Sequence, residues 1–279
     1  MPNYHVSRRS RDRVFQGGIG FALCNEFARQ GCKVYATSRK VESIGDFSFP
    51  SVEKLALDVT SDEAVERVVK HIVEVEGKID VVVNNAGLAY SGPLIDQAME
   101  DVKANFDTNT FAILRMAKAV IPLMATRRSG VIVNIGSIVG EIATPWNGLY
   151  CASKAAVQSI SDVLQMECKP FNISVFHVAP GGIQSNISAN GMSRFKLPEG
   201  SLYTAFLPNI IQRINASQAP GAMPTDVFAK KVVTKALQKK PPSYFSTGAN
   251  ATLFAIFKWL PKSFVLWLMW RVYSKKIAS

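Results

Sequence analysis

The segment Tyr-Cys-Ala-Ser-Lys, residues 150–154, places a tyrosine and a lysine four positions apart. On a helix this spacing puts both side chains on one face, about one turn apart. A phenol is a poor acid or base at neutral pH because its unperturbed pKa is about 10. An ammonium group beneath the ring is expected to lower that pKa and to make Tyr150 usable in proton transfer. A solvated helix face is the alternative interpretation, and the surrounding sequence decides between the two.

Three upstream segments have the pattern of an open α/β sheet. Residues 131–137, Val-Ile-Val-Asn-Ile-Gly-Ser, and residues 81–87, Val-Val-Val-Asn-Asn-Ala-Gly, are β-branched runs that end in small and polar residues, as buried parallel strands do. Residues 17–20, Gly-Gly-Ile-Gly, open a predicted helix over 21–30. Because ligands bind at the carboxyl ends of such strands, Ser137 is expected to point into the ligand crevice.

These four segments, in this order and at these intervals, resemble the short-chain dehydrogenase/reductase family over about residues 16–245. The resemblance implies the α/β class and a Rossmann-like, doubly wound parallel sheet. It also implies a catalytic group of Asn, Ser, Tyr and Lys. Ser137, Tyr150 and Lys154 match that group directly, and Asn109 matches the asparagine that interrupts a long helix and helps to hold a water near the lysine.

The activity implied by the resemblance is reduction of a ketone, or oxidation of an alcohol, by hydride transfer. Ser137 would orient the carbonyl oxygen and Tyr150 would exchange its proton with it. Lys154 would lower the pKa of the tyrosine and contact the nicotinamide ribose. The redox chemistry itself belongs to the nicotinamide.

The residues after the predicted strand 33–37 indicate which nicotinamide cofactor is bound. Ser38, Arg39 and Lys40 stand there. An acidic side chain would bind the ribose hydroxyls, whereas two cations and a serine suit a 2′-phosphate. The sequence therefore predicts NADP; the alternative for Arg39 is a solvated loop charge.

The predicted cofactor site extends from the glycine turn along the strand ends. Glycines there let the backbone approach a pyrophosphate at the helix N-terminus. The cysteines and histidines lack the spacing of metal ligands, so no metal is expected. The residues that the resemblance assigns to the cofactor are Gly18, Ile19, Gly20, Ser38, Arg39, Asp58, Val59, Asn85, Ala86, Gly87, Tyr150, Lys154, Ile183 and Ser185.

The first fifteen residues depart from the family pattern. The family places a hydrophobic strand ending in Thr-Gly in the middle of the sheet, but residues 8–15 read Arg-Arg-Ser-Arg-Asp-Arg-Val-Phe. The segment has no apolar region of a secretory signal and is short for an organelle presequence. We expect that the first strand is missing or replaced, as in a splice form or gene model with a different first exon. Residues 1–15 then form an atypical basic segment before a reductase domain at 16–250.

Two regions near the C-terminus are expected to contact the substrate or a membrane. Residues 186–224 have the composition of a mobile lid with an apolar inner face. Within a tail at 251–279, two apolar runs are each shorter than the ~20 residues that cross a bilayer. Their tryptophans and the cations that follow suit a helical hairpin in the interface of an anionic leaflet. A tail packed over the substrate pocket is the alternative, and the two are compatible.

The net charge of +11 fits an anionic membrane surface or a phosphorylated small molecule. No nucleic-acid-binding motif is present, so nucleic acid is not expected as a partner. The glycine turn, the Ala-Thr-Ser-Arg segment at 36–39 and the tail most resemble the 1-acyldihydroxyacetone-phosphate reductases of the family.

That resemblance implies NADPH-dependent reduction of 1-acyldihydroxyacetone phosphate to 1-acylglycerol 3-phosphate. The protein is then expected on the cytoplasmic face of the endoplasmic reticulum membrane or on lipid droplets. A homodimer would pair two long helices, expected over 99–125 and 150–168. The alternatives are a retinol or hydroxysteroid dehydrogenase and an inactive scaffold protein without the first strand.

Overall fold

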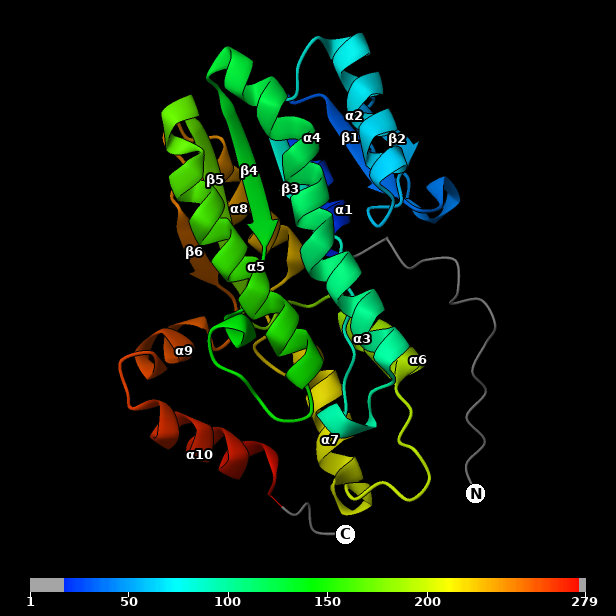
Figure 1. Ribbon diagram of the computed structural model, residues 1–279, viewed down its shortest axis with the longest axis vertical. Coiled ribbons are helices and arrows are strands. Elements are labelled where there is room, and N and C mark those ends of the chain that lie inside the picture. The colour runs from blue at the N-terminus through cyan, green and yellow to red at the C-terminus, as the bar shows by residue number, and fades with distance from the viewer. Residues whose placement is uncertain (1–17, 276–279) are drawn as a thin grey trace.

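The strands of this protein form two parallel sheets (Figure 1). The computed structural model describes residues 18–275, so the expected basic segment 1–15 lies outside the described residues. In the first sheet, β1 (Val34–Ser38) pairs with β2 (Val52–Ala56). The second sheet contains, in spatial order, β3 (Val81–Asn84), β4 (Gly130–Ile135), β5 (Ile173–Pro180) and β6 (Tyr244–Thr247).

The edge of β1 that faces away from β2 has no paired strand among residues 18–275. Val34 N donates to Ser51 O, so the backbone groups of Val34 point toward β2. Along a strand, the backbone N–H and C=O groups of successive residues point alternately to one edge of the strand and to the other. The N–H and C=O groups of Tyr35 and Thr37 therefore point away from β2.

The same reasoning applies to β3. Val131 N donates to Asp80 O, so Asp80 points toward β4. The backbone groups of Val81 and Val83 therefore point toward the first sheet, where β1 is the nearer strand (Figure 1). Every residue of β3 keeps some exposed surface, whereas all but one residue in each of β4 and β5 are buried. The described residues thus leave a gap at the position where the family has its first strand.

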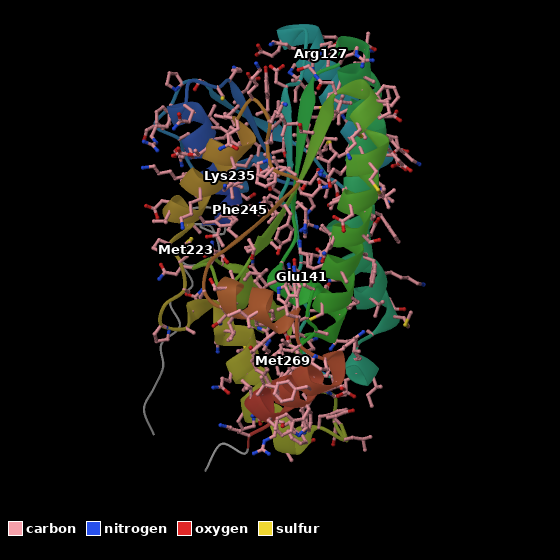
Figure 2. All side chains as sticks on the ribbon, turned by 90° about the vertical axis from the view of Figure 1, so that its left-hand side faces the viewer. Arg127, Glu141, Met223, Lys235, Phe245 and Met269 are labelled. Atoms are coloured by element: carbon pink, nitrogen blue, oxygen red, sulfur yellow. The ribbon has the colours of Figure 1, made fainter. Side chains whose placement is uncertain are left out.

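Helices cover both faces of the sheets, as the edge-on view in Figure 2 shows. One layer contains α1 (Ile19–Arg29) and α8 (Thr225–Ala236), which pack directly on each other and on β4 and β5. The other layer contains α2 (Asp62–Glu76), α4 (Ala112–Arg127) and α5 (Gly148–Glu167). Val34 and Val81 join the core beneath α1 and α8, so this core holds the two sheets together.

Most expected elements are present, with two differences. The helix expected over 99–125 has its expected interruption at Asn109, where a π-helical turn separates α3 (Met99–Phe106) from α4. The expected lid contains two helices, α6 (Ile187–Arg194) and α7 (Leu207–Ile214). The elements α8 and β6 were not predicted; β6 is short and follows two prolines that give no strand signal.

The C-terminal residues form α9 (Ala251–Phe257) and α10 (Lys262–Tyr273), which pack beside the N-terminal end of α5. Phe254, Val265 and Met269 are buried there, and Figure 2 shows Met269 on this part of the ribbon. Lys258 Nζ lies 2.9 Å from Glu141 Oε2, whose side chain is almost fully buried. None of the helices in residues 18–275 has the length and hydrophobicity of a membrane span.

The gap beside β3 predicts alternating amide protection along that strand. The amide of Val82 donates into the ladder with β4, whereas those of Val81 and Val83 point into the gap. In hydrogen exchange of the full chain followed by NMR, Val81 and Val83 should exchange roughly tenfold faster than Val82. Equal protection of all three amides would show that a further strand pairs with β3.

Candidate active site

The expected catalytic side chains meet at the carboxyl end of β4. Helix α5 carries Tyr150 in its first turn and Lys154 one turn later. Ser137 follows β4, and its Oγ accepts a hydrogen bond from Val139 N at 3.3 Å. Ser137 lies close enough to Tyr150 to lower the pKa of its phenol. A carbonyl oxygen placed beside this pair can therefore contact both hydroxyl groups.

Lys154 is held against the same strand. It is only 4% exposed, and its Nζ donates to Ile135 O at 2.7 Å. The Nζ atom lies 5.7 Å from the centroid of the Tyr150 ring. Burial lowers the pKa of Lys154 to about 8, because an apolar environment disfavours the charged ammonium.

The expectation that Lys154 lowers the pKa of Tyr150 is wrong for this geometry. Burial is the largest influence and raises the pKa of Tyr150 to about 12. Cys151 raises that pKa further, whereas Arg213 and Ser137 lower it. Lys154 directs its ammonium to the Ile135 carbonyl, not to the phenol oxygen. Tyr150 is consequently protonated at neutral pH, the state required of a proton donor.

Asn109 lies in the π-helical turn Asp107–Phe111 between α3 and α4, where the sequence placed a helix interruption. Its Oδ1 accepts from Leu88 N at 2.7 Å, and its Nδ2 donates to Leu88 O at 2.9 Å. The same Nδ2 donates to Ser153 Oγ at 3.0 Å. Asn109 thereby joins the segment after β3 to α5, one residue before Lys154.

The expected cofactor residues line the carboxyl edge of both sheets. Gly18 caps α1 without a side-chain hydrogen bond, and the first turn has no acidic residue, so its amides are available to an anion. A Cβ on Gly20 would lie 2.7 Å from Asn85 Nδ2, and a Cβ on Gly87 would lie 3.8 Å from Lys154 Nζ. Gly20 thus lets α1 approach the strand end at Asn85, and Gly87 lies beside Asn109 and Lys154. We call this edge, from the start of α1 to Lys154, the cradle; its free amides suit the pyrophosphate of a dinucleotide.

The residues expected to read the 2′-phosphate lie at the ends of β1 and β2. Arg39 is exposed. The hydrogen bond from Thr60 is the largest cause of the lowered pKa of Asp58, and the charge of Arg39 lowers that pKa further, whereas desolvation raises it. Ser38 Oγ is 3.0 Å from Ser43 Oγ. The three predicted residues Ser38, Arg39 and Asp58 are thus brought to one corner of the cradle.

Two predicted cofactor residues use their side chains in the core. Ile183 is 3% exposed and packs beneath α1 and α8, while Val59 packs against the core under α2. Only their backbone groups remain for a cofactor. Ser185 O accepts from Gln218 Nε2 at 2.8 Å, which fixes the loop after β5. Ala86 is exposed at the edge between Asn85 and Gly87.

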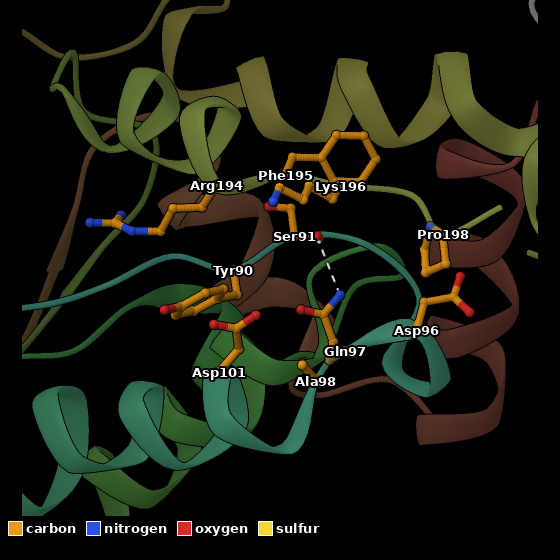
Figure 3. Close-up of a pocket in the computed structure, with 10 residues that line it drawn as sticks. All are labelled: Tyr90, Ser91, Asp96, Gln97, Ala98, Asp101, Arg194, Phe195, Lys196 and Pro198. Atoms are coloured by element: carbon orange, nitrogen blue, oxygen red, sulfur yellow. Dashed lines mark hydrogen bonds between the residues drawn. The ribbon is translucent and has the colours of Figure 1, made fainter.

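An apolar corner formed by lid and tail lies beside the catalytic group. Trp146 is buried against Ile210 and Ile214 of α7, and Phe195 packs on the same cluster. A cavity of about 280 Å³ lies on the side of the lid nearer α3. Figure 3 shows the residues that line it, among them Tyr90, Gln97 and Phe195. Its charged groups have both signs: Asp96, Asp101, Arg194 and Lys196.

Sequence reasoning missed Arg213, the Trp146 wall and the role of Tyr273. Trp146 Nε1 donates to Tyr273 O at 2.9 Å, a contact between residues 127 positions apart. Arg213 reaches Thr144 from α7 and acts electrostatically on Tyr150. In the sequence, only the composition of the lid and the aromatic residues of the tail pointed to this region. Neither pattern predicts which residues are in contact.

Comparison with known proteins places this arrangement in a family. The family model described as short chain dehydrogenase matches residues 15–194. The NADPH-dependent 1-acyldihydroxyacetone phosphate reductase of Schizosaccharomyces pombe is 34% identical over 204 residues, covering 72% of this chain and 69% of that protein. The 3-ketodihydrosphingosine reductase of Bacteroides thetaiotaomicron is 34% identical over 249 residues, covering 88% and 90%.

A solved structure agrees with both sequence matches. The short-chain dehydrogenase from Streptomyces avermitilis superposes with a TM-score of 0.76 at 27% identity, covering 86% of this chain and 88% of that one. The Rossmann-like fold with parallel strands is the fold predicted from the sequence. With the Ser137, Tyr150 and Lys154 geometry at the strand ends, the matched model and these relatives show that the chain belongs to the short-chain dehydrogenase family.

Proposed function

We propose that this oxidoreductase reduces a lipophilic ketone with NADPH. The observation that carries the proposal is Tyr150, held protonated beside Ser137 in an apolar corner. A phenol that is protonated at neutral pH can donate a proton to a forming alkoxide. This and the two reductases among the relatives support the reductive direction.

Each catalytic side chain has one task in this reaction. The nicotinamide supplies the hydride when the cofactor is bound. Ser137 orients the carbonyl oxygen, and Tyr150 donates its proton to that oxygen. Lys154 anchors α5 to β4 through Ile135 O, and Asn109 fixes the neighbouring residue Ser153. The product is the corresponding alcohol.

Replacing Tyr150 by phenylalanine removes the proton donor and little else. We expect Y150F to lower kcat by roughly 10²–10⁴-fold, the usual contribution of a general acid, with NADPH affinity and Tm nearly unchanged. The matched control is Y35F, because the Tyr35 hydroxyl bonds Glu76 on the surface, away from the catalytic residues. Turnover of Y150F within tenfold of the original chain would remove the catalytic assignment.

NADPH is favoured over NADH by the corner of Ser38 and Arg39. Arg39 is exposed and has no ion pair among residues 18–275. Its guanidinium is therefore suited to charge-assisted hydrogen bonds with a 2′-phosphate. The Schizosaccharomyces pombe relative is itself named as NADPH-dependent.

The variant R39A tests this preference. It should weaken NADPH binding by ~1.5–3 kcal/mol, the value of a hydrogen bond to a charged group, and weaken NADH much less. Fluorescence titration with both cofactors measures the difference, and R67A on the exposed face of α2 is the control. Equal losses for NADPH and NADH would mean that Arg39 does not read the phosphate.

The substrate we propose is 1-acyldihydroxyacetone phosphate, reduced to 1-acylglycerol 3-phosphate. The 34% identity with the fission-yeast reductase and the net charge of +11 support it. A long acyl chain suits the aromatic wall of Trp146, Phe206 and Trp270, whose rings lie 5.2–5.7 Å apart. A lipid ketone without phosphate is the second candidate, because the Bacteroides thetaiotaomicron relative is a 3-ketodihydrosphingosine reductase.

The same proposal includes attachment to a membrane surface through the tail. α10 and the turn between α9 and α10 expose large apolar side chains: Trp259 of the turn is 89% exposed and Trp267 of α10 is 51% exposed. The cytoplasmic face of the endoplasmic reticulum or a lipid droplet offers such a surface with anionic lipid.

Homodimerisation belongs to the proposal too, through the outward faces of α4 and α5, where Leu123 and Met166 are exposed.

Membrane attachment is tested best without deleting the tail, because α9 and α10 are part of the core. The full chain should sediment with vesicles of phosphatidylcholine and phosphatidylserine. Replacing Trp259 and Trp267 together by serine should reduce the bound fraction roughly tenfold, since both rings would lie in the interface. L202S, at an equally exposed leucine of the lid, is the control. If the full chain does not sediment, or the double variant binds equally well, the attachment proposal fails.

A further inference from the structure

Arg213 is a partly buried cation without a carboxylate partner. It lies on α7, where Nε and Nη2 donate to Thr144 Oγ1 over 3.2 and 3.1 Å. Its Cζ is 5.4 Å from the centroid of the Tyr273 ring in the tail. No ion pair within residues 18–275 includes Arg213. The loop at Thr144 and the tail at Tyr273 therefore hold the Arg213 side chain in place, but neither contact neutralises its charge.

A guanidinium in such a position is suited to an anion. It has five N–H donors in a rigid fork, and Thr144 Oγ1 accepts from only two of the nitrogens. Removing a charge from water is costly unless the charge is paired. Arginine forms paired, charge-assisted hydrogen bonds with phosphate oxygens, which a single ammonium cannot reproduce.

Arg213 also lies within reach of the reacting group. Thr144 Oγ1, which it holds, is 3.8 Å from the Sγ of Cys151, the residue after Tyr150. The positive charge of Arg213 lowers the pKa of both Tyr150 and Cys151, although burial outweighs it at each. The charge of Arg213 therefore acts at the position of the Tyr150 phenol, where the proposed reaction places the carbonyl.

The other cations near the site are less suited to this role. Arg194 and Lys196 line the cavity of Figure 3 together with Asp96 and Asp101, so two carboxylates offset two cations there. Arg194 lies over the Tyr90 ring, at 6.0 Å from its centroid, on the side of the lid away from the tail. Arg213, in contrast, acts electrostatically on Tyr150 and also contacts the Tyr273 ring beside the aromatic wall.

We propose that Arg213 is the anion-binding residue of the substrate site, and that it receives a phosphate monoester one carbon away from the ketone. The proposal rests on the function proposed above and adds the residue that selects a phosphorylated ketone over a neutral one. The acyl chain lies along Trp146, Phe206 and Trp270, whose rings border α7 and the tail. Thr144 and Tyr273 keep the guanidinium aligned.

The kinetic test compares 1-hexadecanoyldihydroxyacetone phosphate with the neutral 1-hexadecanoyldihydroxyacetone. R213Q should raise KM for the phosphorylated ketone about 10–100-fold, the loss expected for a charge-assisted pair. Loss of the Arg213 charge near Tyr150 should change kcat by the same factor with either ketone, because the proton donor is shared. KM for the neutral ketone should stay within about threefold, as expected when only binding of the phosphate is lost, and R213K should fall between R213Q and the original chain. An equal rise in KM for both ketones would show a structural role and overturn the proposal.

An equilibrium measurement decides the matter even if neither ketone is reduced. Glycerol 3-phosphate should bind the full chain and change tryptophan fluorescence, because Trp146 bonds Tyr273 beside Arg213. Neutral glycerol should not bind, R213Q should lose the signal, and R194Q should keep it. Equal titrations of R213Q and the original chain, or no binding to either, would overturn the role of Arg213. Absence of turnover with both ketones would instead count against the proposed reductase activity.

Discussion

The buried hydrogen bond from Lys154 Nζ to Ile135 O is the contact on which the site depends. An ammonium group that is 4% exposed needs a partner, and the last carbonyl of β4 provides it. This bond fixes the position of α5 relative to the end of β4. It thereby also fixes the position of Tyr150 relative to Ser137. Asn109 secures the same turn from the opposite side by bonding Ser153 and both backbone groups of Leu88. The reacting hydroxyls are thereby set by elements of the fold.

Within residues 18–275, helix packing holds the glycine turn in place. Gly18 lies at the start of α1. That helix is held by α8, through Leu23, Phe27 and the buried side chain of Phe228. Burial of Phe228 in this cluster thus ties the start of α1 to the core that also contains β4 and β5.

The sequence predicted the parts of this structure that local patterns encode. The β-branched runs at 131–135 and 173–178 read as parallel strands, and the residues at their ends were expected at one edge. The π-helical turn at Asn109 matched the expected helix interruption. The pKa of Tyr150 was mispredicted, because spacing places Lys154 beneath the ring but does not reveal the Ile135 carbonyl or the burial. Arg213 could not be found, because its position depends on contacts with Thr144 and Tyr273, which lie 69 and 60 residues away along the chain.

Hydrogen bonds and a cation–π contact link the lid to the tail. Trp146 Nε1 donates to Tyr273 O, and Asn209 Nδ2 of α7 donates to Lys275 O, so main-chain carbonyls at the end of the tail bond both the loop before α5 and the lid. Arg213 adds a third contact, since it rests on the Tyr273 ring. Displacing α10 would break these bonds together and would also expose Val265 and Met269. A force on the outer side of the tail, such as insertion of its tryptophans into an interface, therefore acts on the wall of the substrate site and on the cation beside Tyr150.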